Sequence, residues 1–400
     1  MNTPFLEAMP IIELLHSAGY EAYFVGGAVR DVLLGREIGD IDIATSAKPE
    51  EIQDLFSKTI DVGAEHGTII VLHEGNSFEV TTFRSESEYD DFRRPRQVDF
   101  ISSLEEDLKR RDFTINAMAM DVKGQIIDYF HGQSDLAERV IRTVGIPAER
   151  FHEDALRMLR AVRFVSQLQF QLTDETKEAI RSNAHLLNKI SIERKVVEVE
   201  KLLVGNGFKE ALYSLINLDI HSYLPGFHQS YDQISQLAEL PLHKITRRDQ
   251  LWTILAYIVK PIEVESFLRQ WKLPNKLIRA VHKNLHFLHK RLDHIEWTEI
   301  LIYEAGEETA KTVELLVSVL HPLREANEMY QIIEAIVKEL PILTKKELDI
   351  TGKEVLDWLN KEPGPWVSKT ISQIECAVVK KEIPNQAAAI KEWVLNCNQK

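Results

Sequence analysis

Residues 24–45 read FVGGAVRDVLLGREIGDIDIAT, and this stretch decides the fold of the first third of the chain. The apolar run Ala22–Val25 predicts a short strand that leads into Gly26-Gly27. A helix is expected over Ala28–Leu34 and a second strand over Ile41–Ala44. The stretch therefore predicts a strand, a glycine turn, a helix and a second strand in close succession.

Two carboxylates alternate with two isoleucines in the second strand. Successive side chains of a strand point to opposite faces, so Asp40 and Asp42 are expected on one face while Ile41 and Ile43 are buried on the other. Neighbouring carboxylates repel each other, and a bound cation usually offsets that repulsion. Hard oxygen ligands favour Mg²⁺, which indicates two-metal phosphoryl transfer. Alone, an Asp-x-Asp pattern is most often only a surface strand.

The glycine pair has a separate expected role. Because Gly26 and Gly27 lack Cβ atoms, they allow backbone N–H groups at a helix start to approach phosphate oxygens. Arg30, one turn into the helix, can reach the same phosphates.

In this order, GG-x-V-R-D (26–31), L-L-G-R (33–36) and D-x-D (40–42) form a specific signature. The string resembles the DNA polymerase β nucleotidyltransferase superfamily, in its class II branch of tRNA nucleotidyltransferases and bacterial poly(A) polymerases. The resemblance implies a third carboxylate from a neighbouring strand. Glu79, which alternates with Phe78 and Val80, is the candidate, and the alternative is an exposed strand residue.

Residues 110–119, RRDFTINAMA, carry polar side chains between apolar ones. An ion-paired helix start would explain Arg111, Asp112 and Asn116. The resemblance instead implies the motif that recognises the ribose, with Arg111 and Asn116 at the nucleotide. Asp112 would accept a hydrogen bond from the 2′-OH, the group that distinguishes ribose from deoxyribose.

Residues 153–164, EDALRMLRAVRF, predict a helix on which Asp154, Arg157, Arg160 and Arg163 form a polar stripe. The general interpretation is an exposed helix laced with Asp–Arg pairs. The resemblance implies a protein template for the incoming base, with Arg160 and Arg163 holding base or triphosphate. Cytosine and adenine present an amino donor beside a ring-nitrogen acceptor, so an accepting carboxylate beside a donating guanidinium suits both and mismatches uracil and guanine.

The polar loop 85–96, with three arginines within Arg93–Arg96, joins two expected strands. In the CCA-adding family a loop here helps the switch from CTP to ATP, so its presence favours full CCA addition over a CC-only activity. The resemblance also identifies Ile192-Glu193-Arg194 as a motif that stiffens the neck.

The expected fold class is α+β, with a polymerase-β-like head of mixed sheet and helices followed by an all-helical neck, body and tail. A helix is expected over Pro10–Ala18, and Thr45 or Ser46 should cap another that has Pro49 in its first turn. The remaining expected elements are strands at Thr68–Leu72, Ser77–Phe83 and Val98–Phe100 (the last resuming the sheet), a hairpin within Val122–Tyr129, and helices from about Glu153 onward. The domain boundaries expected are 1–145 for the catalytic head, 146–205 for the neck, 206–300 for the body and 301–400 for the tail.

The net charge of −14 argues mildly against a nucleic-acid partner, but binding needs only a local basic surface. Between Lys272 and Arg291 lie six Lys/Arg, three His and no acid. This stretch is either a solvated amphipathic helix or a surface that grips tRNA phosphates. The RNA-binding candidates are Lys272, Lys276, Arg279 and Lys283. The segment Pro363-Gly364-Pro365 is either the start of a helix that holds an RNA phosphate or a simple turn between two helices.

Two cysteines without metal spacing, an N-terminus unlike a signal peptide and no long apolar run predict a cytoplasmic protein without a membrane partner. We see no His-Asp phosphohydrolase module. The resemblance implies a compact bacterial CCA-adding enzyme that uses CTP, ATP and tRNA with an incomplete 3′ end. Poly(A) polymerase, CC-only or A-only enzymes and an inactive RNA-binding module are the alternatives.

Overall fold

The computed structural model describes residues 3–86, 98–228 and 230–397 and divides the chain into two compact units, Met1–Glu239 and Leu240–Lys400. The polar loop with Arg93–Arg96 lies almost wholly outside the described residues. The α+β fold class is confirmed, while the finer four-part division stays a prediction. None of the helices in the described part of the chain has the length and apolarity that crossing a membrane requires.

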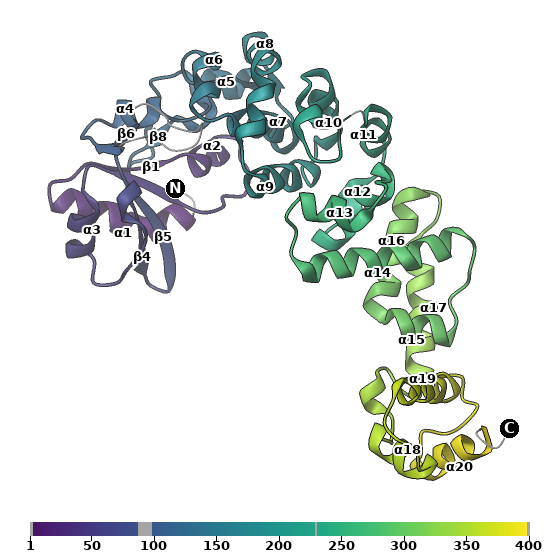
Figure 1. The fold of residues 1–400 in the computed structure, drawn as a ribbon. Coiled ribbons are helices and arrows are strands. Elements are labelled where there is room, and N and C mark those ends of the chain that lie inside the picture. Colours follow the sequence, from purple (N-terminus) through teal and green to yellow (C-terminus); the bar gives the residue numbers. More distant parts are fainter. Residues whose placement is uncertain (1–2, 87–97, 229, 398–400) are drawn as a thin grey trace. The chain divides into compact units, whose positions relative to one another are not determined.

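A mixed sheet of seven strands forms the head of the first unit (Figure 1). Strand β2 lies near its middle, antiparallel to β1 and parallel to β5. The order across the sheet is β3 (Thr59–Gly63), β4 (Thr68–His73), β5 (Asn76–Thr82), β2 (Asp42–Thr45), β1 (Ala22–Val25), β8 (Ala119–Met120) and β9 (Ile126–Ile127).

One face of this sheet is a hydrophobic core. Phe24, Ile43, Val80 and Ile69 pair in register across β1, β2, β5 and β4, and all four are fully buried. Helices α1 (Thr3–Ser17) and α3 (Pro49–Leu55) cover this face, and the ring of Phe5 on α1 lies 4.9 Å from that of Phe24. The opposite face carries Asp42 and is covered only in part, by a second hydrophobic core that includes Val25 and Ala44.

Four expectations for the head need correction. Strand β2 begins at Asp42, so Asp40 precedes it. Lys48, not Thr45 or Ser46, is the N-cap of α3, because those two hydroxyls hydrogen-bond to the backbone of Glu21. Strand β3 was not expected. Strand β7 (Val98–Phe100) does not resume the main sheet but pairs with β6 (Arg84–Glu86) in a separate ribbon.

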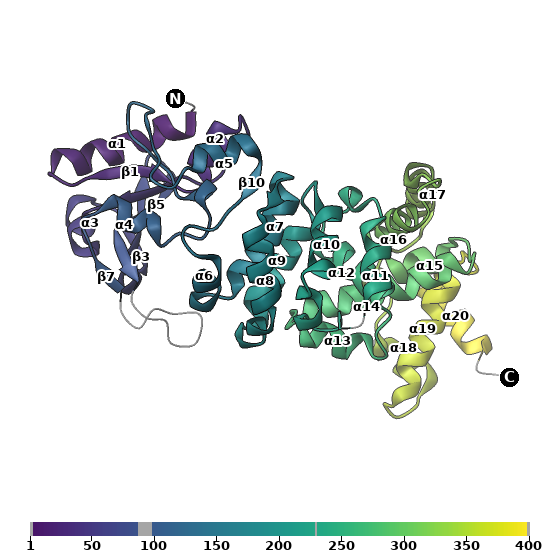
Figure 2. The ribbon, with the colours of Figure 1, turned by 90° about the horizontal axis from the view of Figure 1, so that it is seen from above.

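After the last strand of the main sheet, the first unit is mainly helical, and α7 and α9 pack against each other (Figure 2). A short strand, β11 (Gln171–Leu172), pairs with β10 (Val140–Ile141) and is an exception to the all-helical expectation after Glu153. Besides α1 and α3, the helices of the first unit include α2 (Gly27–Leu33), α4 (Leu104–Lys109) and η2 (Thr114–Asn116), which lie between sheet strands in the chain. They also include α5 (Gly132–Glu138), α6 (Pro147–Glu153), α7 (Leu156–Leu168), α8 (Asp174–Asn183), α9 (Ile192–Leu203), α10 (Phe208–Asn217) and α11 (Tyr231–Ala238).

The described part of the second unit is helical, as expected. One hydrophobic cluster, which includes Ile342, Val355, Ile374 and Val394, forms the core of its C-terminal part. The helices are α12 (Arg248–Val259), α13 (Val264–Gln270), α14 (Asn275–Leu292), α15 (Glu299–Ala305), α16 (Glu307–Leu320), α17 (Ala326–Glu339), α18 (Gly352–Leu359), α19 (Pro365–Val379) and α20 (Ala387–Cys397).

Candidate active site

A cavity of about 960 Å³ in the first unit gathers most of the candidate site residues. It lies between the sheet face that carries Asp42, the start of α2, the segment 110–116 and helices α7 and α9. Of the candidate residues in the first unit, Asp40 is not among those that line it. The lining candidates are Gly26, Gly27, Arg30, Asp42, Glu79, Arg111, Asp112, Asn116, Asp154, Arg157, Arg160 and Arg163.

Two carboxylates meet on the sheet face at the cavity. Asp42 pairs in register with Glu79 across the parallel strands β2 and β5, so both side chains project from the same face. Burial and the nearby charge of Glu79 raise the pKa of Asp42 to about 6, although Arg111 opposes the shift. Asp40 is exposed just before the strand and adds a smaller electrostatic effect. In the structure, Glu79 and not Asp40 is the carboxylate that lies beside Asp42 in the cavity.

The donor set fits a divalent metal that is completed by substrate. Among the described residues, no group of three or more His, Cys, Asp or Glu side chains forms a ready metal site. Mg²⁺ is commonly held by one or two carboxylates together with substrate phosphates and water. A half-buried carboxylate with an elevated pKa beside a second carboxylate matches that arrangement, because a cation would relieve their repulsion.

Gly26 occupies a position where a side chain would intrude. It caps α2 with φ of 74°, in the left-handed region that favours glycine. A Cβ at this position would lie 3.1 Å from the Arg111 guanidinium and 3.5 Å from Oδ2 of Asp42. The bare backbone thus keeps the helix start, the arginine and the carboxylate within reach of one phosphate group.

We expect Gly26→Ala to slow nucleotide addition by about tenfold or more, because it combines backbone strain with contact against Arg111. Gly35→Ala is the matched control, since Gly35 has φ of 63° but no atom within 4 Å of the place that an alanine methyl group would take. Addition rates and CTP affinity by calorimetry would check this. Equal losses in both variants would show that strain alone matters.

Segment 110–116 forms a hydrogen-bonded hub rather than a regular helix start. Asp112 is buried, and its carboxylate accepts from the backbone of Phe113 at 2.9 Å, from Asn116 at 3.3 Å and from Nε of Arg160 at 2.7 Å. Burial opposes ionisation of Asp112, but the charge and hydrogen bond of Arg160, with the effects of Arg157 and Asn116, together outweigh burial and lower the pKa of Asp112. Arg30 donates to Asn116 at 2.7 Å. Asp112 is thus an ionised acceptor at the cavity wall.

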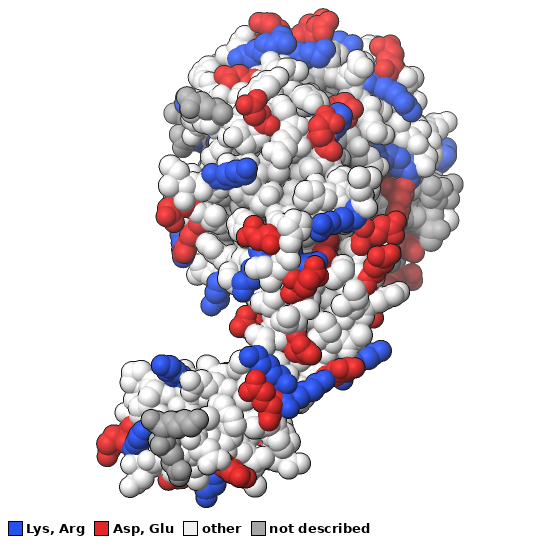
Figure 3. Space-filling model, turned by 90° about the vertical axis from the view of Figure 1, so that its right-hand side faces the viewer, with Lys and Arg blue, Asp and Glu red and all other residues white. Residues whose placement is uncertain are grey.

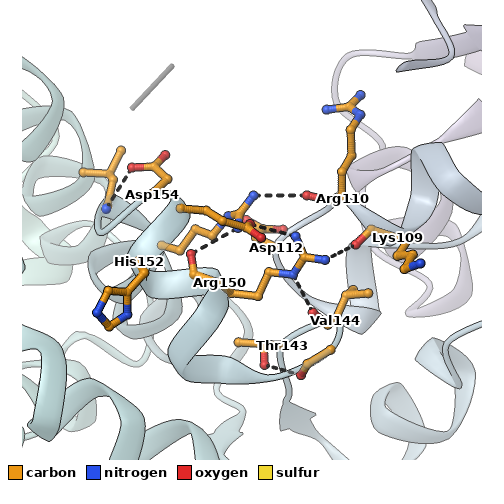
Figure 4. Close-up of polar contacts among 12 residues, drawn as sticks. Lys109, Arg110, Asp112, Thr143, Val144, Arg150, His152 and Asp154 are labelled. Carbon is orange, nitrogen blue, oxygen red and sulfur yellow. Dashed lines mark hydrogen bonds and ion pairs between the residues drawn. The ribbon is translucent and has the colours of Figure 1, made fainter. Parts of the chain in front are cut away.

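The base-reading candidates do not share one helix, contrary to the expectation. Asp154 has an extended backbone between α6 and α7, and it accepts a hydrogen bond from the backbone N–H of Leu156 (Figure 4). Arg194 on α9 donates to both oxygens of Asp154, at 3.1 and 2.6 Å. Arg157 is buried on α7 and donates to the backbone oxygens of Arg150 and Arg110.

The interpretation of α7 as an exposed helix is wrong. Arg157 and Arg163 are each less than a tenth exposed, and Asp154 and Arg160 are half-buried. The Phe164 ring has Arg163 at 4.3 Å, Arg30 at 5.4 Å and Arg160 at 5.9 Å from its centre. Arg163 also pairs with the buried Glu198 at 2.7 Å. Three guanidinium groups thus converge on one wall of the cavity, which suits an anionic triphosphate.

Two residues important to the site were not identified as such from the sequence. Asp107 is almost fully buried and holds Arg110 at 2.8 Å, Arg111 at 3.3 Å and the backbone N–H of Arg84 at 3.3 Å. Arg194 appeared only within a stiffening motif, yet it lines the cavity and binds Asp154. The Arg pair after Asp107 was the available signal for the first, since buried arginines need a carboxylate partner.

The RNA-binding candidates lie in the second unit. Lys276, Arg279 and Lys283 are exposed on one side of α14, whereas Ile278, Val281 and Leu285 of the same helix are buried. Lys272 is exposed just before the helix. This placement fits either a solvated face or a phosphate-binding face. Helix α19 does begin at Pro365, as expected, with Gly364 as its N-cap.

Family models match three parts of the chain. Residues 22–142 match the poly A polymerase head domain, and residues 169–230 match the probable RNA and SrmB-binding site of polymerase A. Residues 243–394 match a putative second domain of tRNA nucleotidyltransferases. The head match and the carboxylate-lined cavity define a nucleotidyltransferase.

Whole-chain relatives narrow this class. The chain is 48% identical to the CCA-adding enzyme of Bacillus licheniformis and 46% identical to that of Bacillus subtilis, each over 100% of both chains. The structure of the Bacillus stearothermophilus CCA-adding enzyme in complex with CTP matches with a TM-score of 0.94 and 44% identity, covering 100% of this chain and 98% of that one. A tRNA nucleotidyltransferase complexed with a primer tRNA and an incoming ATP analog matches with a TM-score of 0.62 and 26% identity, covering 82% and 98%. The chain belongs to the family of CCA-adding enzymes, nucleotidyltransferases that depend on a divalent metal.

Proposed function

We propose that this chain adds C, C and A to the 3′ end of tRNA from CTP and ATP, releasing pyrophosphate at each step and using Mg²⁺. The carrying observation is that one cavity joins the Asp42–Glu79 face to the Asp154 and Arg157 side chains. Because the transferase residues and the base-reading pair line the same cavity, the protein itself can select the nucleotide that it adds, without a nucleic-acid template. Free cysteines at positions 376 and 397 suit the reducing cytoplasm where tRNA is processed.

In the catalytic part of the cavity, one group of residues would hold the metal and another would hold the phosphates. Mg²⁺, when bound, would activate the attacking hydroxyl and stabilise the leaving pyrophosphate. Asp42 and Asp40 are the proposed ligands, and Glu79 is the proposed third carboxylate. The α2 start at Gly26-Gly27, Arg30 and Arg111 would orient the triphosphate. Asp112 would accept from the ribose 2′-OH, with Asn116 holding its carboxylate in place.

The base-reading pair has the chemistry to select C and A. Asp154 accepts three hydrogen bonds from Leu156 and Arg194, which leaves acceptor capacity on Oδ2 for the amino group of a base. Arg157 can donate only, and so matches a ring-nitrogen acceptor. The two hydrogen bonds from Arg194 fix the orientation of the Asp154 carboxylate. Uracil and guanine offer a carbonyl and a ring N–H, which this pair would leave unmatched.

The decisive experiment incubates tRNA that lacks its CCA end with each NTP, alone and combined, and sequences the product ends. We expect C, C and A in that order, with no U or G. A long A tail would indicate poly(A) polymerase activity, and products ending in CC or gaining only A would indicate the partial enzymes. No addition by the intact chain in Mg²⁺ would overturn the proposal.

Acidic and basic side chains are interspersed on the surface drawn in Figure 3, and the net charge of the chain is −14. Binding of RNA phosphates therefore requires a local cluster of basic side chains. We propose that Lys272, Lys276, Arg279 and Lys283 bind phosphates of the tRNA acceptor arm, with the start of α19 as a second contact. Binding of phosphates releases counterions, so affinity should fall steeply with salt. These contacts to backbone should not distinguish one tRNA from another.

Replacing all three of Lys276, Arg279 and Lys283 by glutamine should weaken tRNA binding. The slope of log affinity against log salt concentration should become shallower by about two to three. Affinity for CTP should not change, because that site is in the first unit. The charge-preserving variant Lys276→Arg/Arg279→Lys/Lys283→Arg is the control and should keep the slope. A slope unchanged by neutralisation would return α14 to a solvated helix.

A further inference from the structure

One row of side chains runs along the sheet face that carries Asp42, from the edge strand to the carboxylates. The strand registers pair Ile60 with Ile70, Ile70 with Glu79, and Glu79 with Asp42. Side chains at paired positions project from the same face. Two isoleucines therefore continue the line of the two carboxylates toward the edge strand β3.

These isoleucines belong to an apolar strip, formed by Ile60, Val62, Ile70 and Leu72. Ile60 is 47% exposed, Val62 54% and Leu72 39%, while Ile70 is half-buried. Val62 lines the same cavity as Asp42 and Glu79, so the strip is continuous with the candidate active site. Exposed apolar side chains gathered beside a catalytic centre indicate a binding surface, since their exposure to water is unfavourable.

The order of the strands assigns the two reactants to opposite sides of Asp42. The leaving pyrophosphate belongs at the start of α2, which follows β1, on one side of β2. Attacking and leaving oxygens lie roughly in line in phosphoryl transfer. The attacking hydroxyl must therefore arrive from the other side of β2, which is the side of β5, β4 and β3.

We infer that the apolar strip seats the 3′-terminal nucleoside of the RNA being extended. This inference rests on the proposed function and assigns its priming site. Neighbouring strands lie about 4.8 Å apart, so Ile70 and Ile60 are about 5 and 10 Å beyond Glu79. A nucleoside with its 3′-OH at the carboxylates covers that span. Thr68 and Arg84 line the cavity on this side and can meet the sugar and phosphate.

An apolar seat also suits the chemistry of successive additions. The priming residue of the first addition belongs to the body of the tRNA, and the next two are cytidines. A seat that serves all three must hold a base without reading its hydrogen-bonding groups. Branched aliphatic side chains offer contact area to the face of any base and no donors or acceptors. Selectivity is then confined to the incoming nucleotide at Asp154 and Arg157.

The test compares Ile60→Ser/Val62→Ser with the wild type on tRNA transcripts whose 3′-terminal residue is either intact or abasic. With intact ends, the double variant should lose about tenfold in kcat at all three additions, with CTP affinity unchanged. An abasic end should slow the wild type by a similar factor and slow the double variant little further, because base and strip act as one contact. Ile60→Thr/Val62→Thr, which retains the branched β-carbons that favour strands, should show the same pattern more weakly.

Leu6→Ser/Leu14→Ser is the matched control, because both leucines are exposed on α1, which covers the other face of the sheet. It should behave as wild type. The inference would be overturned if the loss of kcat from the abasic end and the loss from Ile60→Ser/Val62→Ser multiplied when the two were combined. A wild-type kcat in Ile60→Ser/Val62→Ser would overturn it as well. An association of chains that the strip substitutions abolish without any change in addition would make the strip a protein interface instead. A wild-type chain that adds no nucleotide would overturn the proposed function itself.

Discussion

Asp42→Asn should reduce nucleotide addition by at least about a thousandfold, the scale on which loss of a metal-binding carboxylate removes stabilisation of the transition state. Asp42 lines the cavity and pairs in register with Glu79, which lines it too. Asp40→Ala is expected to abolish addition as well. Single-turnover incorporation of labelled CTP into tRNA, in Mg²⁺, measures both.

Asp42→Asn should not weaken the fold, and this property separates a loss of catalysis from misfolding. Burial and Glu79 raise the pKa of Asp42 from 3.8 to about 6, so the ionised carboxylate costs about 3 kcal/mol in the folded state at neutral pH without metal. This cost develops as the pH rises from about 4 to 6 and is absent at lower pH. Asp42→Asn should therefore unfold at the same or a higher temperature in chelator at pH 7.

Asp54→Asn is the control, since Asp54 is an exposed acid on α3, the helix on the covered face of the sheet. It should affect neither activity nor stability appreciably. Near wild-type incorporation by Asp42→Asn would refute the metal assignment. Full activity in Asp40→Ala alone would instead transfer the second ligand role to Glu79, which the strand register favours.

Asp154→Asn should damage nucleotide choice more than any other property. The amide can still cap α7 at Leu156, but it adds donors and loses the charge that pairs with Arg194. Discrimination of CTP over UTP should fall by about two orders of magnitude, because a site built on hydrogen bonds loses rejection when its acceptor changes. Arg157→Ala should act in the same direction.

The measurement is the ratio of kcat/KM for CTP and UTP, with tRNA affinity followed separately. Asp174→Asn is the control, an exposed acid at the start of α8 in the same unit. Its ratio should equal that of the wild type. An Asp154→Asn chain that still rejects UTP and GTP fully would exclude Asp154 from base reading.

The regular parts of the head could be predicted because local pattern and tertiary burial agree there. Ile41 and Ile43 alternate with acids, and the buried face of the sheet takes both isoleucines. Strand β3 could not be predicted because Ile60, Asp61 and Val62 are all exposed. The alternation of apolar and polar residues in this short segment does not correspond to a buried and an exposed face. The cap of α3 was misplaced because Thr45 bonds to Glu21, a partner 24 residues away.

The site was predictable in its membership but not in its internal bonding. Asp154 continues the periodicity of α7 in the sequence, yet a break in the helix and Arg194, 40 residues later, set its conformation. Asp107 follows Glu105 and Glu106 and looks like part of a solvated acidic turn. Its burial depends on the arginines that surround it, and no local pattern contains that information.

The division of the chain after Glu239 has a consequence for the order in which the protein gains its abilities. Among the residues that the structure describes, those that line the candidate active site all lie from Gly26 to Arg194, within the first unit. Domains generally fold as units during synthesis, the N-terminal one first, and making Leu240–Lys400 takes on the order of ten seconds. During synthesis, the first unit with its nucleotide site can therefore fold before the second unit, which contains α14, is complete.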